Sequence, residues 1–439
     1  MKGDFALCQV GTGVAGRKAG RKCAGVGARL WLAAACMAAV NLAIRGTWIA
    51  AVHPAPSSDY AWYFNAATRL ADGLGYVQGN GEPTAYWPVG WPFTLSVIFR
   101  FTGPSVAAGL VLQTVLSAVT AALVTVLAHR LTGELRVAVA AGVAYTLLPS
   151  GWAWDSQLGS EQTFTVLVVA MLLVLAGAEG ASRFAVAGAL AGLACLVRPT
   201  LLVFPAALLL IELLRRRALR RALLHTVAFT LAMSVVIAPW TSRNAVVLGS
   251  PVPVSTNGGI NLYQGTRTTS GYWWSSDPAD NPLLRTDDEV VRDRMGTDLA
   301  FEFWSEHPGR LVAEAPSRIA GLYSGNETPF RWLHIHGDWS PETYRQWQRA
   351  ADLVYWALMA VACVGAVVLG RRRRQVLSLL GGFLVFYTAL WCLFPTWDRF
   401  RFPLMPVFAV LAGCGFLSSR NRDTSASASG DSPRPRSRV

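Results

Sequence analysis

The sequence carries little charge for its length. Of its 439 residues, 15% are Asp, Glu, Lys or Arg and 53% are hydrophobic, whereas soluble globular domains carry charge on roughly a quarter of their residues. Mean hydropathy is +0.36. These values exclude an ordinary soluble enzyme and indicate an integral membrane protein.

Acidic residues are scarcer than basic ones. The chain holds 26 Asp and Glu against 39 Lys and Arg, a formal net charge of +13. The basic residues cluster between apolar runs, at Arg215–Arg217 and Arg371–Arg374 among other places, which is typical of cytoplasmic loops facing anionic lipid. The pattern predicts a multi-pass protein of the cell inner (plasma) membrane with both termini in the cytoplasm, and it argues against nucleic acid as a partner.

Motifs for several common chemistries are missing. The seven cysteines include no CxxC pair, so neither a disulfide scaffold nor a zinc motif is indicated. The stretch "GTGVAG", Gly11 to Gly16, matches GxGxxG, but no strand precedes it, and this excludes a dinucleotide site. "HIHGD", His334 to Asp338, is either a surface loop or a metal ligand pair, and no metal residue is predicted.

Apolar runs long enough to cross the bilayer, together with shorter ones suited to a bundle, predict about ten transmembrane helices. Their approximate bounds are 29–50, 105–128, 136–148, 160–178, 184–197, 200–214, 222–240, 351–370, 376–394 and 403–417. The short apolar piece Trp91–Phe99 is assigned to a re-entrant or juxtamembrane element, because counting it as a span would move the interior basic clusters outside.

The spans divide the chain into five parts. The predicted organisation is a cytoplasmic leader (1–28), an amino-terminal transmembrane module (29–240) with a first outer loop at 51–103, an outer soluble domain (241–350), carboxy-terminal transmembrane helices (351–418) and a disordered cytoplasmic tail (419–439). The outer domain is expected to mix helix with a short strand in "SPVPVSTNGGINLYQGT". The predicted fold is therefore an all-α polytopic membrane protein with a mixed α/β outer loop domain.

Two acids stand at predicted outer helix ends. Asp59 follows the first span and has Tyr60 and Tyr63 beside it, while Glu161 stands with Asp155 just before the fourth span. Each acid either caps a helix amino terminus or acts as a catalytic group. The aromatics either form an interfacial belt or line a site.

Arginines accumulate on the same predicted face. They are Arg198, Arg243, Arg399 and Arg401. A single arginine at a helix end is explained by snorkelling, but four together suggest an anionic ligand, and the planar guanidinium fork suits phosphate. Acids, arginines and aromatics together predict a site for a phosphate-linked sugar at the outer membrane face.

Six stretches in order resemble one known enzyme family. They are "SSDYAWYFNAATRLADGLGYVQGNGEPTAYWPVGWPF", "SEQTF", "LVRPT", "APWTSRN", "VPVSTNGGINLYQG" and "RFRFPLMP". From about Leu30 to Leu417 the chain resembles the bacterial GT-C glycosyltransferases, the branch with the family 39 or protein-O-mannosyltransferase-like enzymes and the aminoarabinose transferase. Two departures stand out: Tyr60 replaces the second acid of an Asp-Glu pair, which argues against a protein acceptor, and Trp87 replaces a lysine of the aminoarabinose branch.

The resemblance implies a GT-C fold and transfer of a sugar from a polyprenyl-phosphate donor to an outer-face glycan, lipid or protein, usually with inversion. It places the family's first-loop acid on Asp59 and its second-loop acid on Glu161, and it makes Trp87 and Asn257 candidate substrate residues alongside the arginines. Asp59 is predicted to act as general base. Glu161 would orient the acceptor or hold a divalent metal with Asp59.

Two other classes remain open. A transporter or flippase of lipid-linked sugars would place its ionisable groups near the bilayer midplane and show paired halves, whereas the charged residues here lie at outer helix ends. A scaffold protein would leave Asp59 and Glu161 as helix caps.

Overall fold

A computed structural model describes residues 14–216 and 218–415. The first 13 residues of the predicted leader, Arg217 of a basic cluster and the predicted tail from 419 to 439 lie outside the described residues. The described helices are α1 (Val14–Ala51), α2 (Ser58–Ala71), α3 (Gly90–Thr102), α4 (Val106–Thr132), α5 (Leu135–Thr146), α6 (Pro149–Asp155), α7 (Glu161–Ala176), α8 (Ala181–Val197), η1 (Pro199–Leu201), α9 (Phe204–Arg216), α10 (Leu219–Val247), α11 (Gly258–Arg267), η2 (Pro282–Arg285), α12 (Glu289–Glu306), α13 (Pro308–Leu322), α14 (Glu327–His336), α15 (Pro341–Arg372), α16 (Arg374–Trp391), η3 (Asp398–Leu404) and α17 (Met405–Cys414).

The protein is a multi-pass membrane protein, in which five or six helices are candidate spans by length and composition, against about ten predicted. Within the described part of the chain, five helices are long and apolar enough to cross a bilayer: α1, α4, α10, α15 and α16. The pair α5 and α6, bent by 54°, makes a sixth if it counts as one span. The other predicted spans form shorter helices of 16, 17, 13 and 10 residues (α7, α8, α9 and α17). At about 1.5 Å per residue, none of these reaches the roughly 30 Å of hydrocarbon unless the bilayer is locally thinner.

The prediction of a mixed α/β outer domain is wrong. In residues 14–216 and 218–415 no strand is formed, and the β-type pairing consists of two isolated bridges, Val77 with Pro83 and Ser270 with Thr396. Pro251 and Pro253 interrupt the expected strand, since proline donates no ladder hydrogen bond. The residues that follow form α11, because Ile260 and Tyr263 recur at helical spacing and are buried together.

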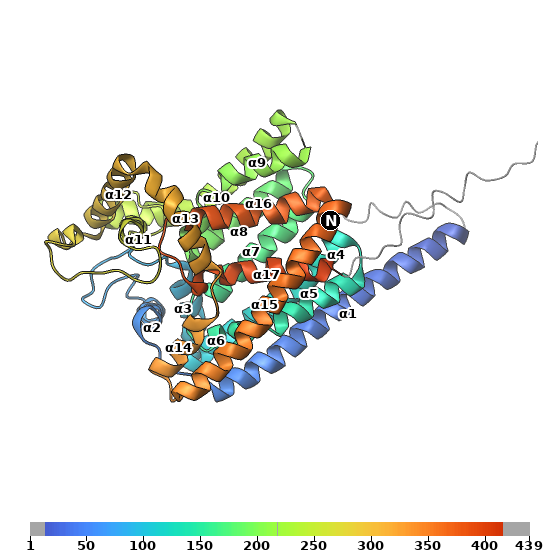
Figure 1. Ribbon diagram of the computed structural model, residues 1–439, viewed down its shortest axis with the longest axis horizontal. Helices are drawn as coiled ribbons and strands as arrows, with labels where there is room; N and C mark the ends of the chain where they lie inside the picture. Colours follow the sequence, from blue (N-terminus) through green and yellow to red (C-terminus); the bar gives the residue numbers. More distant parts are fainter. Residues whose placement is uncertain (1–13, 217, 416–439) are drawn as a thin grey trace, which may run out of the picture.

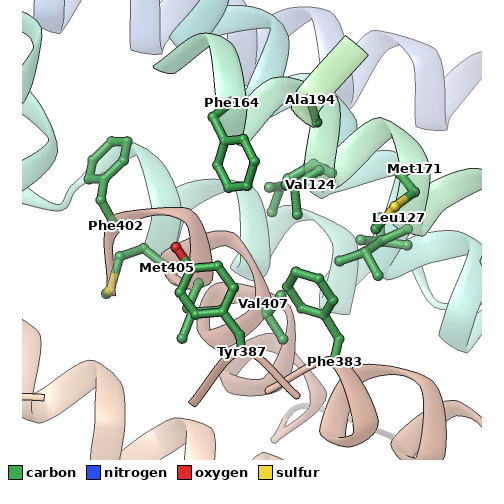
Figure 2. Close-up of a cluster of buried hydrophobic side chains, with 14 of the residues drawn as sticks. Val124, Leu127, Phe164, Met171, Ala194, Phe383, Tyr387, Phe402, Met405 and Val407 are labelled. Atoms are coloured by element: carbon green, nitrogen blue, oxygen red, sulfur yellow. The ribbon is translucent and has the colours of Figure 1, made fainter. Parts of the chain in front are cut away.

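The core of the bundle lies where α4, α7, α8, α16, η3 and α17 meet. Figure 2 shows its side chains, with Phe164 of α7, Val124 and Leu127 of α4, and Phe383 and Tyr387 of α16 turned toward one another. Every described residue of α17 is buried, which is why so short a helix can stay inside a membrane bundle.

Large apolar side chains also cover the outside of the long helices. Val235 of α10, Leu353 of α15 and Val385 of α16 are each at least 70% exposed. An apolar exterior on long helices is expected of a lipid-facing surface. The helices outside the spans, α2, α3 and α11 to α14, gather at one end of the bundle (Figure 1). This end holds the acids and arginines discussed next.

Candidate functional site

Asp59 lies in the first turn of α2 and is not the helix cap. The N-cap is Ser57, whose side chain makes no capping bond, and Ser58 has a φ of 50°. That φ falls in the left-handed region, which is uncommon for serine and marks a constrained turn. Asp59 keeps 27% of its side chain exposed, and its Oδ2 accepts a hydrogen bond from Arg399 Nη1 at 3.2 Å. Its Oδ1 accepts a longer hydrogen bond from Ser58 Oγ at 3.4 Å, so the carboxylate is partly exposed and only loosely held.

Glu161 lies deeper than Asp59. It is the first residue of α7, and 3% of its side chain is exposed. Its Oε1 accepts from Arg198 Nη2 at 2.6 Å and from Arg399 Nε at 2.5 Å. Arg198 also donates through Nε to Ser160 Oγ at 2.9 Å. A buried carboxylate paired with two guanidinium groups is compensated for its loss of hydration.

Arg399 therefore connects the two carboxylates of the site. Its guanidinium joins Asp59 to Glu161 and lies 5.3 Å from the centre of the Tyr60 ring. The two arginines balance the two carboxylates, so the network is neutral. The predicted acids and two of the four predicted arginines, which come from four separate segments of the chain, meet in one cluster.

Aromatic rings form the walls of this cluster. Tyr60 packs edge-on against Trp332 at 5.3 Å, and Tyr63 packs edge-on against Trp87 at 5.7 Å. Burial raises the pKa of the Tyr60 phenol far above its usual range despite the nearby Arg399 charge, and burial followed by the Asp59 charge does the same for Tyr63. Both phenols stay protonated, so they can donate hydrogen bonds but cannot serve as bases.

The remaining predicted residues lie outside this network. Arg243 donates to the backbone carbonyls of Tyr76 and Thr84 at 2.7 and 2.8 Å. Arg401 donates to Asn326 Oδ1 at 2.7 Å and to nearby backbone carbonyls. These two guanidinium groups fix loops around the site, a use that the sequence does not distinguish from anion binding.

Among the described residues, Asn257 likewise makes no hydrogen bond to the side chains of the charged cluster. It precedes α11, and its Oδ1 accepts from Ser255 Oγ at 2.9 Å. Its neighbour Thr256 is joined to the first outer loop by a backbone bond to Ala85 at 3.0 Å. Asn257 therefore lies beside the first loop and remains a candidate for substrate contact.

Asp155 has a different partner from Glu161. Its Oδ2 lies 2.7 Å from Arg45 Nη1, and both side chains are fully buried. Asp155 also accepts from Gln162, the residue after Glu161. This pair ties α1 and α6 to the start of α7. No local pattern predicts this ion pair, because Arg45 lies inside an otherwise apolar predicted span.

Sequence reasoning missed other residues of the site. Trp332 comes from α14, and no local pattern links it to Tyr60. Glu289 of α12 accepts from Thr84 Oγ1 at 2.5 Å and from the Ala85 backbone at 2.7 Å, joining the first loop to the outer segment. In the sequence, Glu289 appears only as an acid at the amino terminus of a helix. Such an acid is common at ordinary helix starts, so it does not indicate a role at the site.

A divalent metal finds little support in the donor set. Among the described residues no group of three or more His, Cys, Asp or Glu side chains is arranged to hold a metal ion. Asp59 and Glu161 are joined by Arg399, so a cation between them would have to displace that guanidinium. His334 donates through Nδ1–H to the Trp339 carbonyl oxygen at 2.6 Å and stacks on Tyr344.

Residues 87–241 match the family of dolichyl-phosphate-mannose-protein mannosyltransferases. This match covers about a third of the chain and agrees with the predicted resemblance to the GT-C membrane glycosyltransferases, which are enzymes. No curated protein matches the sequence.

Two solved structures are similar to this chain at low identity. ArnT from Cupriavidus metallidurans, solved bound to undecaprenyl phosphate, has 15% identity and a TM-score of 0.43, with 81% of this chain and 76% of that chain covered. The oligosaccharyltransferase AglB from Archaeoglobus fulgidus, solved with an inhibitory peptide and a dolichol-phosphate, has 13% identity and a TM-score of 0.47, with 86% of this chain and 50% of that chain covered. This chain therefore aligns with only half the length of the archaeal protein.

Proposed function

We propose that this protein transfers a sugar from a polyprenyl-phosphate donor to an acceptor at the outer face of its membrane. The transfer proceeds by inverting displacement. The observation that carries the proposal is the contrast between two carboxylates sharing one guanidinium. Asp59 is partly exposed and accepts one long hydrogen bond at each oxygen, from Ser58 Oγ and Arg399, whereas Glu161 is buried and paired with Arg198 and Arg399. An exposed carboxylate beside cations, in a chain of this family, suits a base acting on an incoming acceptor.

In the proposed step, Asp59 takes the proton of an acceptor hydroxyl. The acceptor oxygen then forms a bond to the anomeric carbon as the bond from that carbon to the phosphate oxygen breaks. The polyprenyl phosphate leaves with the electron pair, and the sugar inverts. Asp59 suits this role because part of its carboxylate is open to an incoming hydroxyl.

Arg198 and Arg399 are proposed to stabilise the departing phosphate. Glu161 holds both guanidinium groups in place, at 2.6 and 2.5 Å, so they need little reorganisation when the negative charge develops on the phosphate. Glu161 is therefore proposed as a positioning residue rather than as a second base, since its Oε1 is already occupied by two donors.

The test is Asp59→Asn in the purified full-length protein, assayed with a labelled polyprenyl-phosphate sugar and an envelope extract as acceptor source. Loss of a general base typically lowers the rate about 10²- to 10⁴-fold. Glu82→Gln is the matched control, because Glu82 is an exposed acid of the same first loop whose side chain contacts only Asn80. Equal turnover of the Asp59→Asn variant and the wild type would remove Asp59 from the base role.

The rival transporter function has its own outcome. Movement of the labelled lipid across a vesicle membrane with no sugar transfer would favour it.

The orientation of the chain, with Asp59 outside and both termini in the cytoplasm, is also part of the proposal. Reporter fusions within the first loop, near the exposed Asn80, would contradict it if they report a cytoplasmic position.

A further inference from the structure

Two neighbouring aromatic side chains of the outer segment stack on each other and are exposed. Tyr272 and Trp274 stack with their ring centres 6.4 Å apart and their planes inclined by 19°. Tyr272 is 70% exposed and Trp274 is 38% exposed. Trp273 between them turns the other way, packing on Tyr263 at 5.9 Å. Exposing two large rings forgoes the stabilisation that burial of their apolar area would give.

The backbone fixes which rings are turned outward. Gly271 has a φ of 72°, a conformation that glycine adopts without strain, and it immediately precedes Tyr272. Arg267 lies over the rings of both Tyr263 and Trp273, at 4.9 and 5.3 Å, and so helps to hold the anchored ring in place. Tyr272 and Trp274 are therefore presented by an anchored turn rather than by an unsupported loop.

The pair is tied to the charged cluster. The Thr396 backbone N–H donates to the Thr269 carbonyl at 3.1 Å, and Ser270 pairs with Thr396 in an isolated bridge. Thr396 stands three residues before Arg399. Burial raises the pKa of Tyr272, and the Asp59 charge raises it further, so the phenol lies within the field of that carboxylate. The segment that carries the exposed pair thus runs beside the segment that leads to Arg399, whose guanidinium contacts Asp59.

The charges beyond the pair help to select its ligand. Asp277 and Asp280 are exposed further along the same loop, and Asp280 Oδ2 accepts a hydrogen bond from Ser275 Oγ at 3.5 Å. Carboxylates repel a phosphate but accept hydrogen bonds from hydroxyl groups. A pyranose ring presents an apolar C–H face, which stacks on aromatic rings, and hydroxyls at its rim.

We propose that Tyr272 and Trp274 bind the pyranose ring of a carbohydrate acceptor and so direct its hydroxyl toward Asp59. This inference rests on the proposed function for its catalytic meaning and adds that the acceptor is a glycan. Aromatic contacts remote from the reacting atoms supply binding energy that orients the acceptor.

The experiment measures binding rather than turnover. Saturation-transfer NMR is recorded on the full-length protein in nanodiscs with methyl α-mannopyranoside and with maltotriose as probes. The Tyr272→Ala/Trp274→Ala double variant should reduce the transferred signal at least fivefold. Phe301→Ala, which removes another exposed ring (61%) from helix α12, is the matched control and should keep the wild-type signal. An unchanged signal in the double variant, or no signal from either probe with the wild type, would overturn the inference.

Two further arms separate this inference from the proposed function. Asp59→Asn should bind the probes like the wild type while losing sugar transfer. If no transfer is found in any preparation but probe binding depends on Tyr272 and Trp274, the proposed function fails and the carbohydrate platform stands. If a Ser/Thr-containing peptide, and neither pyranoside, binds through these two rings, the platform inference fails while the proposed function stands.

Discussion

Arg399 donates to Glu161 at 2.5 Å across 238 residues of sequence. This contact brings the start of α7 together with η3. In the sequence these two segments appear only as separate polar residues between apolar runs. Because the same guanidinium reaches Asp59, the position of the proposed base depends on a residue near the other end of the chain.

Replacing Arg399 with lysine should impair the site although charge is conserved. A lysine is a single point donor and cannot hold Asp59 and Glu161 at once as the planar fork does. We expect kcat/KM for sugar transfer to fall at least about 10-fold, which corresponds to about 1.4 kcal/mol. Arg331→Lys on α14, whose side chain is 61% exposed, serves as the control. Wild-type kinetics in Arg399→Lys would show that bidentate geometry is not needed.

Gly159 leaves no room for a side chain. A Cβ built there would collide with Glu161 Oε2 and come within 3.1 Å of the Tyr60 ring. Gly159→Ala should therefore displace Glu161 from its two arginines and reduce sugar transfer more than it reduces the thermal midpoint of unfolding. Gly79→Ala, in a first-loop position where a Cβ meets nothing within 4 Å, is the comparison. Activity equal in both variants would contradict this reading of the site.

The buried ion pair of Arg45 and Asp155 gives a prediction about stability. Both side chains are fully buried, so removing one partner leaves the other charge uncompensated, at a cost of about 3–5 kcal/mol. Arg45→Met and Asp155→Leu should each lower the thermal midpoint in detergent. The double variant should be more stable than either single variant, because it removes both charges together. A double variant that loses the sum of both single effects would count against an uncompensated charge as the cause.

Stability should also depend on pH through Asp398. Burial raises the pKa of this carboxyl to about 6, with Arg401 and the hydrogen bonds from Thr328 opposing the shift. A raised pKa means that the folded protein holds the proton more strongly than the unfolded chain does. Stability should therefore fall as pH rises from about 4 to about 6, by up to about 1.4 kcal/mol per pH unit.

Thermal unfolding followed between pH 4 and pH 6.5 checks this dependence. Asp398→Asn should flatten the slope, because the amide does not titrate. Asp338→Asn, an exposed acid after α14, is the charge-matched control. A slope in Asp398→Asn as steep as in the wild type would assign the pH dependence to other groups.

Composition alone determined that this chain is a membrane protein, because so few charged and so many apolar residues cannot cover the surface of a soluble protein. Spacing and residue type also placed Asp59, Glu161 and the arginines at helix ends, because polar groups cannot remain in lipid without partners. The number of spans did not follow, because short helices such as α17 are sheltered by their neighbours, and apolar runs look alike whether they face lipid or protein.

Only the tertiary structure decided which polar residues meet. Arg198 and Arg399 converge on Glu161, whereas Arg243 and Arg401 bind backbone carbonyls, although all four look equivalent in sequence. An arginine offers the same five donors to a carboxylate, a carbonyl or a phosphate, and its choice depends on which acceptors the packed helices bring within about 3 Å. That distance is set by long-range packing, which no local pattern encodes.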